Sequence, residues 1–360
     1  MKKIVVIGGG FAGSLITRKL EKHFNLTLID SKNYFEFTPG ILRTIVEPEH
    51  INKIQISHKD YLKKARIILG YVNEIGQDYV KVNHQNIKFD YLCICSGSRY
   101  KAPIKEQNLV ISARAAHLKM NYGKLCKANK ILIIGGGIVG VELAAEISTH
   151  YKNKDITLVH SKNKLMERNK DKTIKYAGKF LTKKGVKIIY NERVVDAKEN
   201  DKIYHTDKNR KIKTDLAFLC TGIMPNFEFM NKNFNNKLDE KNQIKVNEHL
   251  QLDGEKNIFV AGDVNSTNVE KTAQNAEIQA RVVIKNIFSL EKNKKLKEYN
   301  KKKTPLVISL GKWNGIFESN IFVFTGIIPG IMKSIIELRE MLKLKSRRYI
   351  ATKTFIYLLN

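Results

Sequence analysis

The chain contains two copies of the pattern G-x-G-x-x-G, and each copy follows a short apolar run. The first spans residues 8–13 after the run 3–7, and the second spans residues 135–140 after the run 130–134. In both copies a helical pattern follows, which gives the strand–turn–helix context of a dinucleotide-binding unit. A single copy is weak evidence, because an ordinary strand–helix turn can also need glycine. Two copies predict a chain that holds two dinucleotides and passes electrons between them.

Each glycine of the pattern has a separate task. The first allows a tight turn out of the strand, the second lets the backbone approach a pyrophosphate, and the third lets the helix pack closely on the strand. The pyrophosphate then binds the free N–H groups at the N-terminus of the helix. We therefore expect two sets of cofactor-binding residues: Gly8, Gly9, Gly10, Phe11, Ala12 and Gly13 in the first copy, and Gly135, Gly137 and Gly140 in the second.

The strand after each copy ends in a polar residue. Asp30 ends the apolar stretch 26–29 and lies 22 residues past Gly8, where a carboxylate can accept hydrogen bonds from ribose hydroxyls. His160 ends the corresponding stretch 156–159 and is followed by serine and lysine residues. None of these repels a 2′-phosphate as an acid at this place would. The sequence therefore predicts that NADPH is accepted and that NADH is also used.

The composition is compatible with two domains and an extension. The chain has 360 residues, of which 42% are hydrophobic, and this is enough for ordinary cores. Its net charge of +29 suits an anionic membrane surface or nucleic acid, although the abundance of Lys, Asn and Ile also fits the bias of an AT-rich genome. No zinc-finger spacing, RNP signature or Arg-rich arm accompanies the charge, so we expect no nucleic-acid partner.

The cysteines and the N-terminus bear on the cellular compartment. The four cysteines, Cys93, Cys95, Cys126 and Cys220, form no disulfide framework, which indicates a reducing compartment. Residues 1–3 lead directly into the first apolar run and leave no room for a signal peptide. We therefore expect a cytoplasmic protein, and we expect no bound metal.

Three further apolar stretches run into glycine-containing turns. Residues 90–97 and 215–222 lie on either side of the second glycine pattern, and residues 257–263 end in Gly262-Asp263. The first two stretches resemble each other and enclose the second unit. The second unit therefore reads as an insertion into the first.

The combination resembles the two-dinucleotide flavoproteins, which include glutathione-reductase-like enzymes, type II NADH dehydrogenases and apoptosis-inducing-factor-like proteins. Four segments resemble more closely the ferroptosis-suppressor, apoptosis-inducing-factor-like NAD(P)H:quinone oxidoreductases: residues 135–147, 157–161, 245–251 and Lys345-Ser346-Arg347. This resemblance covers essentially the whole chain. The N-terminal lipidation glycine of the animal members is missing, so any membrane contact must arise otherwise.

The resemblance implies an α/β fold with two Rossmann-like dinucleotide-binding domains, the second inserted in the first, plus a C-terminal extension. Residues 1–106 and 226–300 would bind FAD, and residues 107–225 would bind NADH or NADPH. Residues 301–360 would contact a membrane and its quinone, or would form a homodimer. The implied enzyme passes hydride from NAD(P)H to the flavin and then passes electrons to a quinone.

Two other functions remain open from the sequence: reduction of a protein acceptor such as ferredoxin or rubredoxin, and slow-turnover redox sensing by an interaction protein. Disulfide reductases of this superfamily carry C-x-x-x-x-C in the first domain, but residues 31–46 contain no cysteine. Cys126 and Cys220 are not placed to form a reactive thiol pair beside a flavin. We therefore expect a diffusible acceptor, and a quinone fits best.

The resemblance also assigns residues around the cofactors. Asp263 matches an acid that binds the ribitol of FAD. Arg43 matches an arginine that approaches the FAD pyrophosphate, and a solvated surface arginine is the alternative. The remaining matches are backbone positions: Val72 at the adenine, Gly262 before the ribitol-binding acid, and Gly97 and Gly222 in the two T-G turns of the superfamily.

Three residues are candidates for the chemistry. Glu142 lies two residues past Gly140, where by resemblance it could bind the nicotinamide carboxamide or relay a proton; the alternative is an acid favoured by the helix dipole. Lys271 could lie near the flavin ring, where a cation favours the anionic reduced form. Gln274 belongs to an A-Q-x-A sequence that resembles the quinone pocket of type II NADH dehydrogenases. For Lys271 and Gln274, a plain position on a helix surface is the alternative.

The C-terminal part contains an amphipathic pattern. Residues 321–332 are interrupted by Gly and Pro and are shorter than the about 20 apolar residues that cross a bilayer. The segment 333–348 has six basic and two acidic residues, a net charge of +4. A basic amphipathic helix can lie on an anionic membrane, on the cytoplasmic face in this case. The alternative is that its apolar stripe packs on the FAD domain or on a dimer partner. Helical spacing places four residues on that stripe: Ile331, Ile335, Leu338 and Leu342.

Overall fold

The computed structural model describes residues 1–99, 111–195, 197, 201–300 and 303–345. Its first core is a parallel sheet of five strands in the order β19-β9-β1-β2-β5. Apolar runs form these strands because helices or a second sheet cover both faces. The strands are β1 (Lys3–Ile7), β2 (Asn25–Asp30), β5 (Arg66–Leu69), β9 (Tyr91–Ile94) and β19 (Ile258–Val260).

Two layers enclose this sheet. The helices α1 (Phe11–Leu20) and α7 (Ala273–Glu291) pack on each other and on one face. An antiparallel sheet packs on the other face through Ile75, Val80 and Val82. Its strands are β6 (Val72–Ile75), β7 (Tyr79–Val82) and β8 (Gln85–Lys88).

A second parallel sheet repeats the arrangement. Its order is β13-β12-β11-β17, so β17-β11-β12 corresponds to β9-β1-β2. The strands are β11 (Lys130–Ile134), β12 (Asp155–His160), β13 (Lys187–Tyr190) and β17 (Leu216–Leu219), with the helices α4 (Ile111–Lys127), α5 (Ile138–His150) and α6 (Asp171–Lys183). The antiparallel strands β14 (Val194–Val195), β15 (Ile203–Thr206) and β16 (Lys211–Lys213) supply Tyr204 and Ile212 to its other face.

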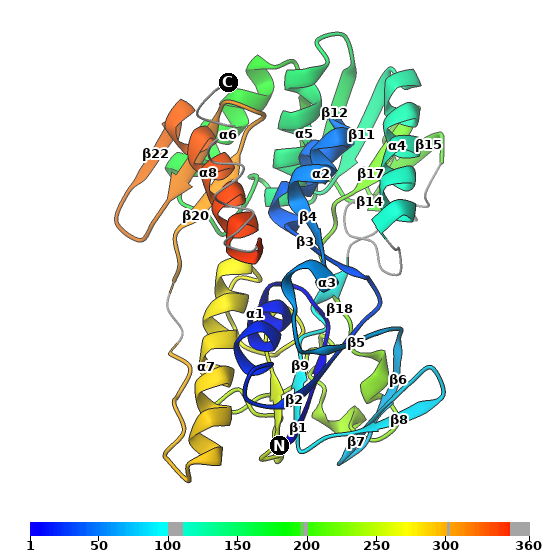
Figure 1. Ribbon diagram of the computed structural model, residues 1–360. Helices are drawn as coiled ribbons and strands as arrows, with labels where there is room; N and C mark the ends of the chain where they lie inside the picture. The colour runs from blue at the N-terminus through cyan, green and yellow to red at the C-terminus, as the bar shows by residue number, and fades with distance from the viewer. Residues whose placement is uncertain (100–110, 196, 198–200, 301–302, 346–360) are drawn as a thin grey trace, which may run out of the picture.

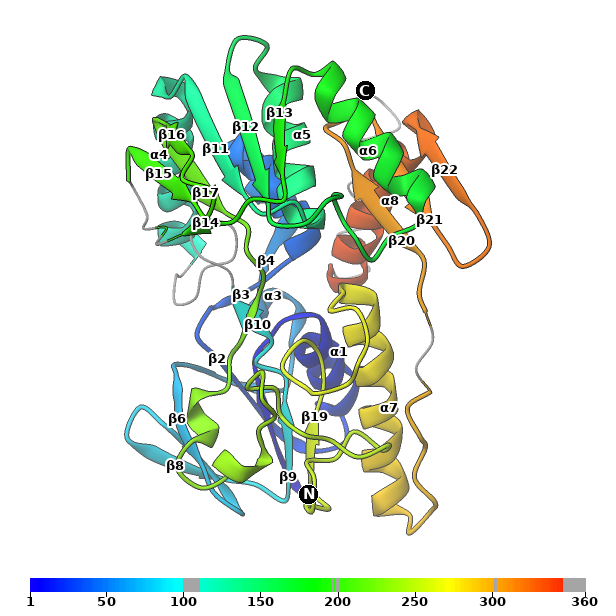
Figure 2. The same cartoon turned by 180° about the vertical axis from the view of Figure 1, so that it is seen from behind.

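The two units lie one above the other in Figure 1 and, seen from behind, in Figure 2, with the N-terminal sheet and α7 below and the second sheet above. Strand β10 (Ser98–Arg99) leaves the first unit and pairs antiparallel with β18 (Met224–Pro225), which returns from the second. The predicted insertion of one α/β unit into the other is therefore confirmed.

The segment after β2 extends from the first unit toward the second. It consists of β3 (Tyr34–Glu36), η1 (Thr38–Ile45), η2 (Pro48–His50), α2 (Ile51–Ile54), β4 (Gln55–Ser57) and α3 (His58–Tyr61). The helix η1 contacts α5 of the second unit. Two short helices, η3 (Glu228–Met230) and η4 (Asn235–Lys237), follow β18.

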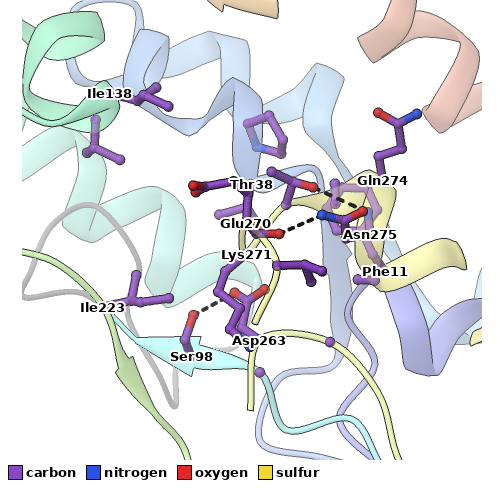
Figure 3. A pocket seen from close by; sticks show the side chains of 18 of the residues that line it. Phe11, Thr38, Ser98, Ile138, Ile223, Asp263, Glu270, Lys271, Gln274 and Asn275 are labelled. Carbon is purple, nitrogen blue, oxygen red and sulfur yellow. Dashed lines mark hydrogen bonds between the residues drawn. The ribbon is translucent and has the colours of Figure 1, made fainter. Parts of the chain in front are cut away.

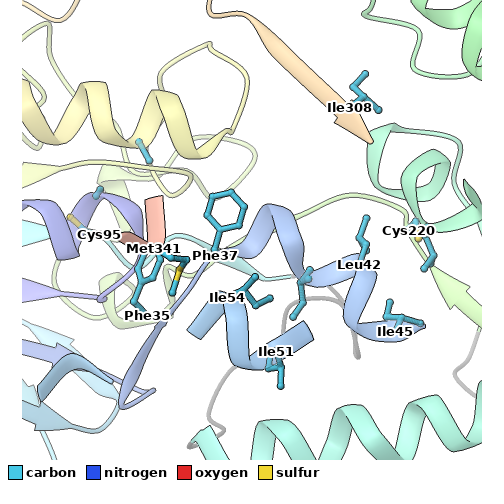
Figure 4. Close-up of a cluster of buried hydrophobic side chains, with 14 of the residues drawn as sticks. Phe35, Phe37, Leu42, Ile45, Ile51, Ile54, Cys95, Cys220, Ile308 and Met341 are labelled. Carbon is cyan, nitrogen blue, oxygen red and sulfur yellow. The ribbon is translucent and has the colours of Figure 1, made fainter. Parts of the chain in front are cut away.

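The C-terminal extension is a small unit of its own. Three antiparallel strands, β20 (Leu306–Ser309), β21 (Gly315–Glu318) and β22 (Val323–Gly326), precede helix α8 (Ile327–Leu344). Pro329 lies in the first turn of α8, where a missing N–H costs nothing. Figure 4 shows Met341 of α8 in the same buried apolar cluster as Phe35 and Ile54. Ser346 and Arg347, which belong with Lys345 to a segment that resembles the family, lie outside the described ranges.

Candidate active site

One cavity of about 2530 Å³ connects the two glycine turns. A site for one small molecule typically has roughly 300–1,000 Å³, so this cavity has room for more than one. Most of the predicted site residues line it: Gly8, Gly9, Gly10, Phe11, Ala12, Asp30, Gly97, Gly135, Gly137, Glu142, His160, Gly222, Gly262, Asp263, Lys271 and Gln274.

The first turn has the geometry that its glycines predict. Gly8 has a φ of +92°, and its N–H donates to the carbonyl oxygen of Ile29 at 2.8 Å. A Cβ on Gly13 would lie 1.8 Å from the carbonyl oxygen of Gly8, so only glycine lets α1 approach the turn this closely. Gly13 therefore acts by packing and does not line the cavity.

Asp30 is held at the end of β2 by a network of hydrogen bonds. Its Oδ2 accepts a hydrogen bond from the N–H of Gly9 at 2.8 Å and lies 3.0 Å from His58 Nε2. Burial raises the pKa of Asp30, but the hydrogen bond and charge of His58, assisted by Lys32, outweigh burial and leave the pKa below its ordinary value. Asp30 is thus an ionised acceptor at the cavity wall. Sequence reasoning did not identify the contribution of His58.

The second turn copies the first. Gly135 has a φ of +111°, and a Cβ on Gly140 would lie 1.9 Å from the carbonyl oxygen of Gly135. The N–H of Gly136 donates to His160 Nδ1 at 3.1 Å, so the neutral ring carries its proton on Nε2. That nitrogen lies 3.5 Å from a carboxylate oxygen of Glu167, an acid that sequence reasoning missed.

Asp263 and Lys271 lie on the side of the cavity formed by the first unit. Ser98 Oγ donates to Asp263 Oδ2 at 2.6 Å, which joins the start of β10 to the Gly262-Asp263 turn (Figure 3). Lys271 Nζ donates to the carbonyl oxygens of Asn265 at 2.6 Å and Thr267 at 3.2 Å. Burial lowers the pKa of Lys271, and the charge of Asp263 opposes that shift.

Gln274 lies in the first turn of α7, beside Asn275 (Figure 3). The helix begins there because the side chain of Thr272 accepts a hydrogen bond from the N–H of Asn275, as an N-cap residue does. Gln274 is exposed, whereas Asn275 is buried and donates to the carbonyl oxygen of Glu270 at 2.7 Å. The structure therefore brings Gln274, Lys271 and Asp263 to one cavity.

Glu142 is buried near the start of α5 and is held by the C-terminal unit. Its Oε1 accepts hydrogen bonds from the N–H of Ser309 at 2.7 Å and from Lys333 Nζ at 2.9 Å. These partners lie 167 and 191 residues away along the chain, and no local pattern in the sequence indicates either contact.

Arg43 and Val72 are not among the residues that line the cavity, although Leu42 beside Arg43 is. Arg43 Nη2 donates to a carboxylate oxygen of Glu146 at 3.1 Å and to the carbonyl oxygen of Gly311 at 3.3 Å. Burial raises the pKa of Glu146 although Arg43 opposes the shift. Arg43 thus joins η1 to α5, and Val72 lies on β6 of the antiparallel layer.

The residues of both turns fit a bound dinucleotide. The N-cap residues of α1 and α5 are Gly10 and Gly137, which have no side chain to cap the helix, so the N–H groups of the first turn can bind a pyrophosphate. A Cβ on either glycine would meet nothing within 4 Å. Within the described part of the chain, His160 Nε2 is buried without a hydrogen-bond partner, and a nucleotide could supply one.

Comparisons with known proteins agree with this arrangement. The family described as pyridine nucleotide-disulphide oxidoreductase matches residues 2–280. The apoptosis-inducing factor homolog B of Dictyostelium discoideum is 34% identical, with 88% of this chain and 89% of that protein covered. Ferroptosis suppressor protein 1 of Xenopus tropicalis is 32% identical, with 88% of each chain covered.

A solved structure extends the agreement to the fold. The sulfide:quinone oxidoreductase of Aquifex aeolicus is similar with a TM-score of 0.78 at 21% identity, over 96% of this chain and 92% of that one. Together with the matched family, this confirms the predicted pair of dinucleotide-binding units. The chain belongs to the pyridine nucleotide-disulphide oxidoreductase family, and it is an FAD-dependent oxidoreductase that uses NADH or NADPH.

Proposed function

We propose that this chain is an FAD-dependent NAD(P)H:quinone oxidoreductase. The observation that carries the proposal is the single cavity that contains both glycine turns together with Glu142, Lys271 and Gln274. When bound, FAD accepts hydride from the nicotinamide and returns electrons to an acceptor. The protein binds the cofactor, orients it and tunes its electrostatic surroundings. The name of the Aquifex aeolicus neighbour, a sulfide:quinone oxidoreductase, supports a quinone as the acceptor.

The cysteines favour a nicotinamide donor over a sulfur compound. Two of them line the cavity, Cys95 after β9 and Cys220 after β17. Burial raises the pKa of each thiol to about 12, so both stay protonated near neutral pH and are poor nucleophiles. All four cysteines are free thiols. A dithiol that could reduce a disulfide or accept sulfide is therefore not supported.

Each residue has a proposed task. In the first unit, Asp30 accepts hydrogen bonds from the ribose of FAD, and Asp263 binds the ribitol. Lys271 places a positive charge beside the flavin. In the second unit, His160 contacts the adenosine ribose of the donor, and Glu142 contacts the nicotinamide carboxamide. Gln274, exposed to the cavity at the start of α7, contacts the quinone.

Steady-state oxidation of NADH and NADPH with a soluble quinone tests this function. Flavin-loaded enzyme should pass electrons to the quinone over many turnovers. A protein that oxidises about one equivalent of NAD(P)H and then stops would be a sensor and would contradict the proposal. Turnover with reduced ferredoxin or rubredoxin as product, and none with quinone, would show a protein-acceptor reductase instead.

We further propose that α8 and its neighbours form a peripheral contact with an anionic membrane. Helix α8 is oriented with most of its charged side chains toward the protein, although Arg339 is exposed. Lys333 pairs with Glu142, and Glu337 lies 3.0 Å from His50 Nε2. One stripe of its apolar side chains faces outward, with Ile335 57% and Leu338 59% exposed, whereas Met341 and Leu344 are buried.

Other large apolar residues of the C-terminal unit are also exposed. They lie on the two turns of the C-terminal sheet and in the first turns of α8, and they are Trp313, Ile321, Phe322, Ile327, Ile328 and Ile331. Exposed apolar surface of this kind often marks a site of contact with a protein or a membrane. In the described ranges, no helix is both long and apolar enough to cross a bilayer. The net charge of +29 complements an anionic surface, where a long-tailed quinone dissolves.

A further inference from the structure

The ion pair between Lys333 and Glu142 connects the C-terminal helix with the second dinucleotide site. Lys333 lies in the second turn of α8, and its Nζ is 2.9 Å from Glu142 Oε1. Both side chains are largely buried, with 16% and 8% of their surface exposed. Both residues also line the cavity. The cation therefore acts inside the site and not on the outer surface.

The C-terminal unit fixes one oxygen of Glu142. The N–H of Ser309 and the ammonium group of Lys333 both donate to Oε1. Lys333 is itself held near the carbonyl oxygen of Val307, at 3.5 Å. In the part of the chain that the structure describes, every hydrogen bond to the Glu142 carboxylate goes to Oε1, and none goes to Oε2. A carboxylate accepts through both of its oxygens, so Oε2 is available to a ligand in the cavity.

We infer that Lys333 is a positioning residue for the nicotinamide of the donor. It neutralises the buried carboxylate of Glu142 and fixes Oε1, so that Oε2 is presented to the carboxamide N–H₂. A carboxylate left without its cation in a buried place is strongly unfavourable and would turn toward water. This inference rests on the proposed contact of Glu142 with the nicotinamide, and it makes the C-terminal unit a part of the donor site.

Equilibrium binding to the oxidised, FAD-loaded enzyme separates positioning from a general structural effect. Two probes are titrated by calorimetry: NAD⁺, which has the nicotinamide, and ADP-ribose, which lacks it. In Lys333→Met, we expect NAD⁺ to bind about tenfold more weakly, equivalent to 1.4 kcal/mol, with unchanged ADP-ribose affinity. In Lys333→Arg, which keeps the cation, the NAD⁺ affinity should largely be retained.

The control is Lys285→Met, which removes an exposed lysine of α7 and should bind both probes as the wild type does. Equal weakening of NAD⁺ and ADP-ribose in Lys333→Met would show that the lysine only maintains the fold, and unchanged affinities would show that it does not act on the nicotinamide. Either result overturns the inference. If Lys333→Met does not retain FAD, Lys333→Gln replaces it in the same titrations.

Glu142→Gln distinguishes failure of this inference from failure of the proposed role of Glu142. If Lys333 acts through Glu142, Lys333→Met should weaken NAD⁺ binding much less in the Glu142→Gln background than in the wild type, because coupled residues are not additive. Full additivity overturns the inference. If Glu142→Gln alone leaves the binding of NAD⁺ relative to ADP-ribose unchanged, the proposed role of Glu142 fails, and the inference fails with it. If Glu142→Gln weakens NAD⁺ binding but Lys333→Met does not, only the inference about Lys333 fails.

Discussion

Asp30 and His160 occupy the same place in two copies of one βαβ unit. Each ends the second strand of its unit, and each accepts a hydrogen bond from the N–H of the second residue in its own glycine turn, Gly9 or Gly136. The first unit therefore offers the nucleotide an ionised carboxylate, and the second offers an imidazole. The two turns have similar backbone hydrogen bonds but differ in this side chain.

His160 and its neighbour Glu167 should set the choice between NADH and NADPH. We expect the wild type to accept NADPH, with a kcat/KM no less than about one hundredth of that for NADH, or about 2.7 kcal/mol. His160→Glu should shift the preference toward NADH by repelling the 2′-phosphate. Glu167→Gln should shift it toward NADPH, because the carboxylate 3.5 Å from His160 Nε2 is neutralised.

Steady-state kinetics with both nucleotides check these expectations. Variants at exposed Lys179, which lies on α6 away from the cavity lining, serve as the control. A preference that is the same in His160→Glu as in the wild type would contradict the role assigned to His160.

The difference between the two units shows what the sequence could predict. The glycine turns, the strands before them and the positions of Asp30 and His160 are local features, because each lies within about 30 residues of its partners in one βαβ unit. The spacing of glycines and apolar runs therefore predicted the two units, and most of the site residues predicted by spacing or by resemblance line the cavity.

Contacts between distant segments could not be predicted in this way. Lys333 reaches Glu142 across 191 residues, and Arg43 reaches Glu146 across 103. Periodicity located the apolar stripe of α8 but not the side that it faces, because a helical period is the same whether the stripe points inward or outward. The structure turns most of the charged side chains inward, and it leaves Leu342 half-buried while Ile331, Ile335 and Leu338 are exposed.

Asp263 should determine how firmly FAD is retained. Asp263→Ala removes a carboxylate at the cavity wall that accepts a hydrogen bond from Ser98. Hydrogen bonds to charged groups contribute roughly 1.5–3 kcal/mol, so FAD should bind about tenfold to a hundredfold more weakly. Flavin fluorescence during dialysis and reconstitution measures this affinity.

The control for FAD retention is Asp155→Ala, which removes an exposed acid from the start of β12. Retention of FAD in Asp263→Ala equal to that in the control would refute the assignment. A colourless wild-type protein that cannot be reconstituted with FAD would be incompatible with the flavoenzyme as a whole.

The thiols should differ sharply in reactivity. Burial raises the pKa of Cys95 and Cys220 to about 12 and the pKa of Cys93 well above its ordinary value, whereas Cys126 is exposed. Because the thiolate is the reactive form, a maleimide at pH 7 to 8 should label one thiol per folded chain and four after unfolding. Labelling should leave quinone reduction unchanged. In the folded protein, Cys126→Ser should abolish the labelling. Rapid labelling of two thiols in the folded state would instead favour dithiol chemistry.

The outward face of α8 should bind anionic membranes. Burying an apolar side chain contributes about 1.5–3 kcal/mol, and charge attraction adds to this at low ionic strength. We expect the protein to co-sediment with liposomes that contain anionic lipid, more strongly at low salt than at high salt. The double variant Ile335→Glu plus Leu338→Glu should bind at least about tenfold more weakly, because both side chains are exposed and contact no core that the substitution would disrupt.

The matched control for membrane binding is Lys285→Glu on the exposed surface of α7. It lowers the net charge by two units, as the double variant does, but it leaves the apolar face of α8 intact. If the membrane contact depends on this face, the control should retain most of the binding that the double variant loses. Equal loss in both would mean that charge alone causes the association. The membrane contact would be contradicted by a wild type that does not bind at low salt, or by a double variant that binds as well as the wild type. The face would then contact a second copy of this chain, and sedimentation velocity would detect a dimer.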